Sequence, residues 1–175
     1  MIQIDALREK LSEATKDMKL NLSSLLRGDQ LTQQEAWGCA LTSAYFVRHS
    51  QLVTALTADS AEILSDEQRE DAKGAAALMG MNTVYYRSRH MIGKEFYEQQ
   101  RAGLRMNRMM KPASGRVNFE LYSMACAALA GCDVCLKSHE ESLLKEGISQ
   151  EKIHEVLRVA AVVNGFAVAY DSEEN

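Results

Sequence analysis

Apolar residues recur along most of the chain at intervals of three and four positions, the period of helices that bury one face. The pattern begins near Asp5, where Leu7, Leu11 and Ala14 share a face. No stretch shows a convincing two-residue alternation of a strand. The pattern therefore predicts an all-α fold. Seven helices are predicted, at about 5–18, 32–47, 50–58, 65–86, 117–130, 132–146 and 149–170.

Turn and capping residues set the limits of these helices. Thr32 and Glu35 have the spacing of a capping box, which marks a helix start. Residues 21–24 (Asn-Leu-Ser-Ser) are expected to form a turn, and residues 90–111, which are mixed and punctuated by glycine, to form a loop with a helical turn. Residues 61–64 fit either a separate short helix or an extension of the helix before them.

The strongest break in the chain is Lys-Pro-Ala-Ser-Gly at 111–115. An offset of 85 residues aligns Glu35 with Glu120 and one helical hairpin with another, which suggests two related helical halves. Chance similarity between two hairpins rich in Ala and Leu explains the alignment equally well. At 175 residues the chain suits one core. The prediction is a single domain, 1–175, with a half of about 1–110 and a half of about 116–175 that contains the active-site hairpin.

Charge and hydropathy exclude several classes of protein. The formal net charge of −4 provides no basic excess for binding nucleic-acid phosphates. The N-terminal residues lack the charged and apolar regions of a signal peptide. The most apolar run, Val156 to Tyr170, is interrupted by Arg158 and Asn164 and is too short for a membrane span. A cytoplasmic protein that binds neither nucleic acid nor membrane is expected.

The four cysteines carry most of the chemical information. In a reducing cytosol a close pair is more often catalytic or metal-binding than structural. Cys39 and Cys126 have no partner at a diagnostic spacing and are expected to be small core residues. Cys132, Cys135 and His139 are spaced by three and four residues, which places them on one face of a helix. Two thiols beside a base predict a dithiol that cycles with a disulfide.

A fourth residue joins this group if helices 117–130 and 132–146 form an antiparallel hairpin. At about 1.5 Å per residue, Glu120 and His139 then lie nearly level on either side of the turn. We expect Glu120 to orient His139 or exchange a proton with it, and His139 to serve the Cys135 thiol. Cys132 is the natural resolving partner, because it can condense with a sulfenic acid on Cys135. An external dithiol must then reopen the Cys132–Cys135 disulfide.

Two simpler interpretations remain at this stage. The thiols and His139 can be three ligands of a zinc ion, with Glu120, His154 or Cys126 as the fourth, in a non-enzymatic binding protein. A second pair of ligands at knuckle spacing is missing, so no bound metal is the leading expectation. Alternatively, Glu120 and His139 can be ordinary solvated side chains.

The chain resembles the AhpD family of alkyl hydroperoxidases, within the carboxymuconolactone decarboxylase-like superfamily. The specific motif is Glu-x11-Cys-x2-Cys-x3-His, and segments throughout the chain support it. This chain differs from one branch of the family at one position. Val134 stands where that branch has a histidine, a possible proton carrier. The matching segments are Lys19–Ser24, Met79–Asn82, Tyr86–Arg87, Gly103–Asn107, Asn118–Ser123 and Gly131–Glu140.

This resemblance implies an all-α homotrimer with lipoyl-dependent peroxidase activity on organic hydroperoxides. It implies no bound cofactor, and electrons from dihydrolipoamide carried by a lipoylated succinyltransferase and its lipoamide dehydrogenase. It also implies reduction of the oxidised peroxiredoxin AhpC. By motif position, Cys135 forms the sulfenic acid and the interchain disulfide with AhpC, Cys132 is the proton donor and resolving cysteine, and Glu120 with His139 forms the proton relay. A decarboxylase-like acid/base enzyme on the same fold is the alternative, although such relatives generally lack the paired cysteines.

Overall fold

A computed structural model describes residues 1–173 and consists of helices joined by turns, without strands in that range. The predicted all-α class is confirmed. The elements are α1 (Ile2–Glu9), a 3₁₀ turn η1 (Glu13–Thr15), α2 (Lys16–Leu25), α3 (Gln33–Val47), α4 (Ser50–Asp59), α5 (Asp66–Ile92), α6 (Glu95–Gln99), α7 (Asn107–Met110), α8 (Arg116–Ala130), α9 (Asp133–Lys145) and α10 (Gln150–Glu173).

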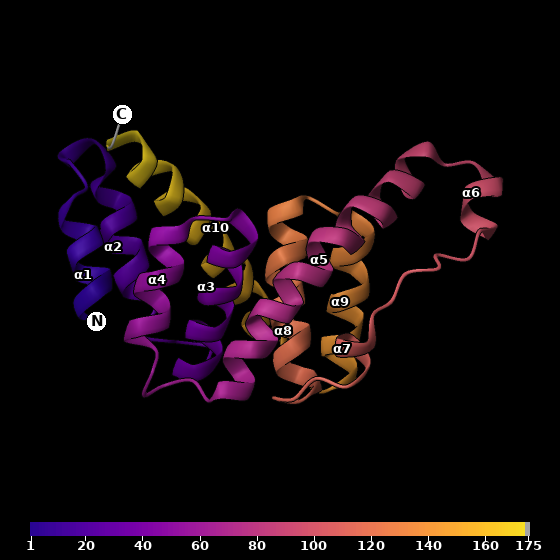
Figure 1. Ribbon diagram of the computed structural model, residues 1–175, viewed down its shortest axis with the longest axis horizontal. Coiled ribbons are helices and arrows are strands. Elements are labelled where there is room, and N and C mark those ends of the chain that lie inside the picture. Colours follow the sequence, from indigo (N-terminus) through magenta and orange to yellow (C-terminus); the bar gives the residue numbers. More distant parts are fainter. Residues whose placement is uncertain (174–175) are drawn as a thin grey trace.

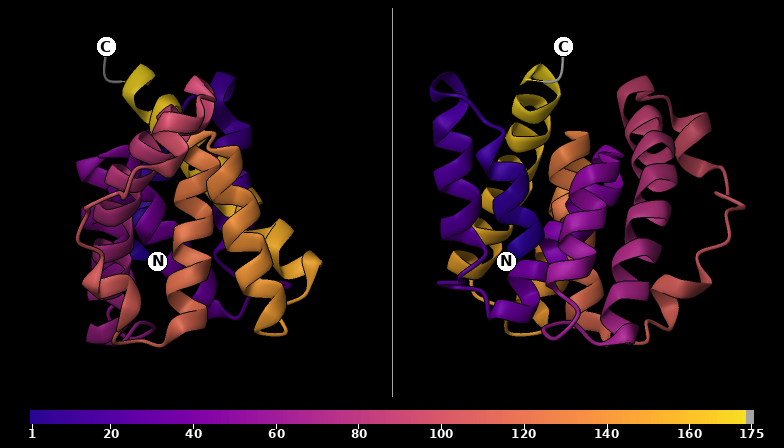
Figure 2. Two further views of the ribbon diagram at one scale, coloured as in Figure 1. Left: turned by 90° about the vertical axis from the view of Figure 1, so that its right-hand side faces the viewer. Right: turned by 60° about the vertical axis from the view of Figure 1, so that its left-hand side comes forward.

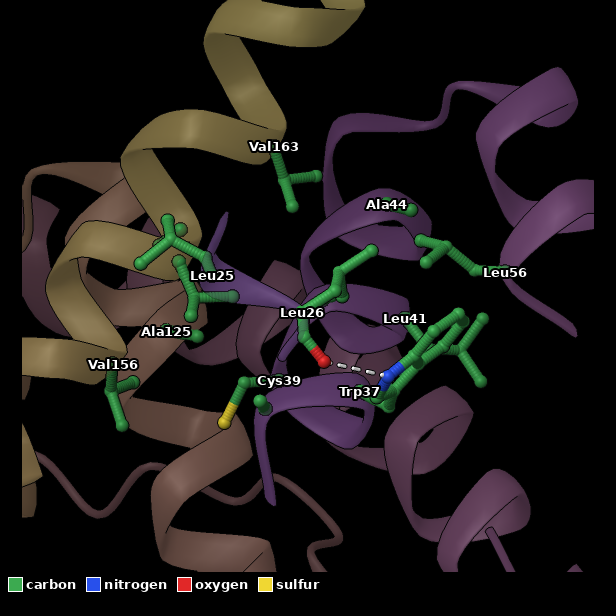
Figure 3. Packing of buried hydrophobic residues seen from close by; sticks show 14 of the residues in the cluster. Leu25, Leu26, Trp37, Cys39, Leu41, Ala44, Leu56, Ala125, Val156 and Val163 are labelled. Atoms are coloured by element: carbon green, nitrogen blue, oxygen red, sulfur yellow. Dashed lines mark hydrogen bonds between the residues drawn. The ribbon is translucent and has the colours of Figure 1, made fainter. Parts of the chain in front are cut away.

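Helix α3 lies at the centre of the core and packs against α5, α8 and α10. Its residues 36–44 are all buried, so it has no solvent face along most of its length. At its start, the Thr32 side chain accepts from the Glu35 amide and Glu35 accepts from the Thr32 amide, which is the predicted capping box. Trp37, also buried, donates from Nε1 to the carbonyl of Leu26 at 3.0 Å, so its one polar atom is satisfied (Figure 3).

Two predictions in the N-terminal region are wrong. The helix expected over 5–18 ends at Glu9, and a 3₁₀ turn separates it from α2. Residues 21–24, expected as a turn, lie inside α2, because Leu22 and Leu25 bury a helical face against the core and α2 packs on α10. Tertiary packing overrides the local turn preference of Asn and Ser here.

The other end of the molecule carries an extension. Figure 1 shows the last turns of α5 and the short α6 reaching beyond the bundle. In the right-hand view of Figure 2, α6 again lies outside the bundle. Helix α5 continues to Ile92 rather than ending near Tyr86 as predicted. The segment 90–111 then contains two short helices instead of one helical turn. The chain returns to the bundle at α7, which packs against α5.

Two hairpins share one turn geometry. Arg48 after α3 and Gly131 after α8 are both left-handed, with φ of 63° and 60°. In each turn the next residue donates its amide to a carbonyl five positions back, His49 to Ala44 and Cys132 to Ala127. This match aligns Glu120 with Trp37 rather than with Glu35, two positions from the alignment predicted from sequence. That the two halves are related stays a prediction.

Helix α10 is long and apolar enough, by length and composition, to cross a membrane. In its most apolar 18-residue window, however, 56% is buried inside the protein. The helix packs against α2, α3 and α8, as a core helix does. The expectation that the chain does not enter a membrane stays a prediction.

Candidate active site

The turn between α8 and α9 fixes the position of the first thiol. Gly131 ends α8 in the left-handed conformation, and its amide donates to Ala128 while that of Cys132 donates to Ala127. These two bonds form a Schellman motif, and glycine adopts the required positive φ without strain. The chain then enters α9 directly, with Cys132 at the N-cap and Cys135 in the first turn.

Cys132 and Cys135 form a disulfide, with their Cα atoms 5.3 Å apart. One helical turn thus brings together the two sulfurs that the sequence pairs. The amides of the first α9 turn have no intrahelical partners, so they favour negative charge at this end of the helix. A thiolate on the reduced site is stabilised there.

Glu120 and His139 lie in contact across the hairpin. Glu120 Oε2 is 2.7 Å from His139 Nδ1, and the two side chains are only 13% and 11% exposed. Neither is therefore the solvated surface residue of the simpler interpretation. Because the carboxylate accepts from Nδ1–H, the neutral ring keeps its lone pair on Nε2, the nitrogen able to take a proton. Which catalytic role each residue plays stays a prediction.

A cavity of about 390 Å³ lies beside Cys135 and His139. Helix α5 and the segment around α7 build its opposite wall, which is mainly apolar. Cys135 lines this cavity and is 7% exposed, whereas Cys132 is fully buried, so Cys135 is the sulfur that an outside molecule can reach. The remaining lining residues are Met79, Asn82, Tyr86, Met106, Met109, Val134 and Ser138.

A buried carboxylate holds the α7 wall in place. Asp71 on α5 is fully buried and accepts from Arg108 Nε at 2.5 Å. It also accepts from the Ser114 amide at 2.6 Å and the Ser114 hydroxyl at 2.8 Å. These bonds link α5 to Arg108 in α7 and to Ser114 just before α8, the two ends of the segment 108–114. The sequence does not identify Asp71 as a site residue, because its partners Arg108 and Ser114 lie about 40 positions away in the chain.

The other two cysteines are buried and free, as predicted. Burial raises the pKa of the Cys39 thiol, and Glu35 raises it further. Burial also raises the pKa of the Cys126 thiol well above its ordinary value. Cys126 nevertheless packs in the same apolar cluster as Cys132 and Cys135, closer to the site than the sequence suggested. A protonated thiol is a poor nucleophile, so neither residue is equipped for the redox chemistry.

The zinc interpretation requires four ligands in one place. In residues 1–173, no group of three or more His, Cys, Asp or Glu side chains is arranged to hold a metal ion. His49 caps α4 and faces Asp171 at 3.2 Å, and exposed His90 faces Asp133 at 3.3 Å. His154, proposed as a fourth ligand, lines a separate surface pocket with Asp29 and Arg158.

Comparisons with known proteins agree with the motif. Residues 97–172 match the carboxymuconolactone decarboxylase family. A protein of Anaeromyxobacter dehalogenans (strain 2CP-C) is 43% identical over 171 residues, covering 98% of this chain and 92% of its own length. Relatives from Mycolicibacterium paratuberculosis and Maricaulis maris are each 42% identical, covering 96% and 98% of this chain and 94% and 99% of their own. All three are named alkyl hydroperoxide reductase AhpD.

Proposed function

The chain belongs to the carboxymuconolactone decarboxylase family and, within it, to the AhpD proteins, and on this premise we propose that it is an alkyl hydroperoxide reductase cycling between a Cys132–Cys135 dithiol and disulfide. One observation carries the proposal. The reachable sulfur, that of Cys135, lines an apolar cavity beside a buried carboxylate–imidazole pair, and a second sulfur lies within bonding reach behind it.

The oxidative half-reaction begins with the reduced site. His139 accepts the Cys135 proton, and Glu120 stabilises the imidazolium that results. The thiolate attacks the terminal oxygen of the hydroperoxide, so the S–O bond forms while the O–O bond breaks. The leaving alkoxide takes a proton and departs as the alcohol. Cys135 is then a sulfenic acid, oxidised by two electrons.

Cys132 completes this half-reaction. Its sulfur displaces hydroxide from the sulfenic acid, water leaves, and the Cys132–Cys135 disulfide forms. The first turn of α9 favours this step, since it already holds the two Cα atoms 5.3 Å apart. Rapid closure also protects Cys135 from further oxidation to a sulfinic acid.

An external dithiol must return the electrons. We propose dihydrolipoamide, because its slender apolar chain suits a cavity lined by methionine, tyrosine and valine side chains. The attacked sulfur is Cys135, since Cys132 is fully buried. The same exposure supports a mixed disulfide between Cys135 and the peroxiredoxin AhpC. In this scheme no cofactor is bound and the reductant is a diffusing or tethered substrate.

We propose a cytoplasmic homotrimer that is served by a lipoylated succinyltransferase and lipoamide dehydrogenase. Exposed apolar side chains on the extension formed by the end of α5 and α6 support self-association, because large solvent-facing apolar surfaces mark protein interfaces. Met91 is 77% exposed, Phe96 66% and Ile92 46%.

A coupled assay tests the function. The protein is mixed with lipoamide, lipoamide dehydrogenase, NADH and cumene hydroperoxide, and NADH consumption is followed. The proposal predicts consumption that depends on both the protein and the hydroperoxide. The Cys39→Ala variant serves as the matched control, because that thiol is buried away from the cavity, and it should retain full activity. Absence of hydroperoxide-dependent turnover with lipoamide and with dithiothreitol alike would contradict the proposal.

A further inference from the structure

Asn82, in the middle of α5, is an unexplained polar residue in the wall of the active-site cavity. It is only 4% exposed and lines the same cavity as Cys135 and His139. Its Oδ1 is buried and has no hydrogen-bond partner within residues 1–173. Buried side-chain polar atoms nearly always have such a partner, so an unpartnered one calls for a reason.

Thr83, the next residue, provides a comparison, because its side chain has a clear structural role. Thr83 is also buried on α5, and its hydroxyl donates to the Met79 carbonyl at 2.7 Å. That side chain is satisfied within its own helix. Asn82 Oδ1 has no corresponding bond within the described residues, 1–173. A purely structural explanation for an amide at this position is therefore missing.

The cavity indicates the kind of ligand that would satisfy it. Three methionine side chains, together with Val134, make the walls around Asn82 mainly apolar. Helices α5 and α9 pack against each other, so Asn82 and Cys135 flank the cavity from two neighbouring helices. A ligand with an alkyl body and one hydroxyl donor matches this lining. An organic hydroperoxide has that composition.

We propose that Asn82 positions the hydroperoxide, with Oδ1 accepting a hydrogen bond from its terminal O–H. This inference rests on the proposed peroxidase function. The bond would hold the terminal oxygen toward the Cys135 thiolate, while the apolar walls hold the alkyl group. The thiolate electron pair forms the S–O bond, the O–O electron pair leaves with the alkoxide, and His139 returns the proton that it took from Cys135. The O–H that Asn82 holds remains on the sulfenic acid, so the bond persists through the reaction.

The test separates the two half-reactions in single-turnover experiments. In Asn82→Leu, which keeps the branching and the number of side-chain heavy atoms, thiol oxidation by cumene hydroperoxide should slow about 10- to 100-fold, the effect of one hydrogen bond made in the transition state. Reduction of the Cys132–Cys135 disulfide by dihydrolipoamide should stay within twofold of wild type. The Tm should not fall, because Oδ1 has no hydrogen bond within residues 1–173 to lose. Thr83→Val is the matched control and should leave both rates unchanged.

The outcomes distinguish this inference from the proposed function. Wild-type oxidation rates in Asn82→Leu would overturn the positioning role and leave the peroxidase function intact. An equal fall in the rates of both half-reactions would also overturn the positioning role, because such a result would indicate a structural role for Asn82. If Asn82→Leu fails to fold, Asn82→Ala provides the same comparison of rates. A wild-type protein whose thiols resist hydroperoxide would instead defeat the proposed function itself.

Discussion

The hairpins α3–α4 and α8–α9 use the same backbone turn for different purposes. Each first helix ends in a left-handed residue, Arg48 or Gly131, and each second helix begins two residues later. At the N-cap, the His49 ring accepts the Leu52 amide at 3.1 Å, whereas the corresponding Cys132 makes no side-chain cap bond and is bonded to Cys135. The turn is therefore a scaffold that does not itself specify chemistry.

The side chains that face inward from the two hairpins show the difference. Aligned at the turn, the first hairpin has apolar residues at three of the four site positions: Trp37 for Glu120, Leu52 for Cys135 and Leu56 for His139. The apolar residues are fully buried or nearly so. The polar ones are buried almost as deeply, which is tolerable because His139 and Glu120 satisfy each other. A catalytic site here amounts to reactive groups placed at core positions next to a cavity.

The largest expected effect comes from removing the reachable sulfur. Cys135→Ser should abolish hydroperoxide turnover, a loss of at least about 10³-fold, because a serine hydroxyl does not form a sulfenic acid or a disulfide. Cys132→Ser should still react once and then hold a sulfenic acid that dimedone traps. Lipoamide-dependent turnover at the wild-type rate in either variant would disprove the assigned roles.

Placing the imidazole of the second hairpin in the first should damage stability instead. Leu56→His puts a ring at a fully buried position that has no carboxylate partner, since Trp37 occupies the place of Glu120. We expect the free energy of unfolding to fall by about 3 to 4 kcal/mol, from lost packing and an unsatisfied polar group. Urea denaturation measures this change. A variant as stable as wild type would show that the two hairpins do not differ in their need for a paired base.

Removing the base from the second hairpin should affect rate more than stability. His139→Phe should slow thiol oxidation about 10²-fold at pH 7, the usual contribution of general base assistance. The deficit should shrink as the pH rises above about 8.5, where an ordinary thiol ionises without help. Glu120→Gln should show a smaller version of the same profile. A deficit that is constant from pH 6 to pH 10 would contradict the relay.

Each hairpin also buries a free thiol. The two thiols should have the same effect on the free energy of unfolding at alkaline pH. Burial raises the pKa of Cys39 in α3 and Cys126 in α8 above the ordinary 9.0, so above about pH 9 the unfolded chain releases protons that the folded chain keeps. Stability should therefore be intact below pH 9 and fall as the pH rises, by about 1.4 kcal/mol per pH unit for each thiol. In the disulfide form, Cys39→Ala and Cys126→Ala should each reduce that slope. An unchanged slope in both would contradict the burial assignment.

The smallest effect concerns the turns themselves. Arg48 adopts a left-handed conformation that is unfavourable for a side chain with a Cβ, whereas Gly131 adopts it freely. Arg48→Gly should raise the free energy of unfolding by about 0.5 kcal/mol, and Gly131→Arg should lower it by about 1 kcal/mol. A Cβ at Gly131 meets no atom within 4 Å outside its immediate chain neighbours, so the expected loss comes from backbone strain rather than from a clash of the Cβ. Equal stability in both variants would indicate that the turns differ in ways unrelated to φ.

Local signals predicted the start of α3 and the site hairpin well. The capping box at Thr32, the glycine turn at 131 and the one-face spacing of Cys132, Cys135 and His139 all depend on residues within a few positions of each other. The position of Glu120 level with His139 followed from the rise per residue of a helix, once the two helices were taken as an antiparallel hairpin. Such features could be predicted because the geometry of a helix and a tight turn is nearly fixed.

Features that depend on distant packing could not be predicted. Residues 21–24 are helical because Leu22 and Leu25 are buried against the core, and the local sequence does not reveal this packing. The cavity joins side chains from α5, the α7 region and α9, and its wall depends on Asp71 reaching Ser114. Asn82 lies in the family-like segment Met79–Asn82, but that segment assigns it no role, and only the three-dimensional structure shows that its buried Oδ1 has no partner within residues 1–173.

Mapping the thiols after one turnover tests the central claim most directly. The fully reduced protein is treated with one equivalent of cumene hydroperoxide, alkylated under denaturing conditions and analysed by peptide mass spectrometry. The account predicts the loss of two thiols and a single disulfide between Cys132 and Cys135, with Cys39 and Cys126 alkylated. Consumption of the hydroperoxide with all four thiols still free, or a disulfide that includes Cys39 or Cys126, would contradict it.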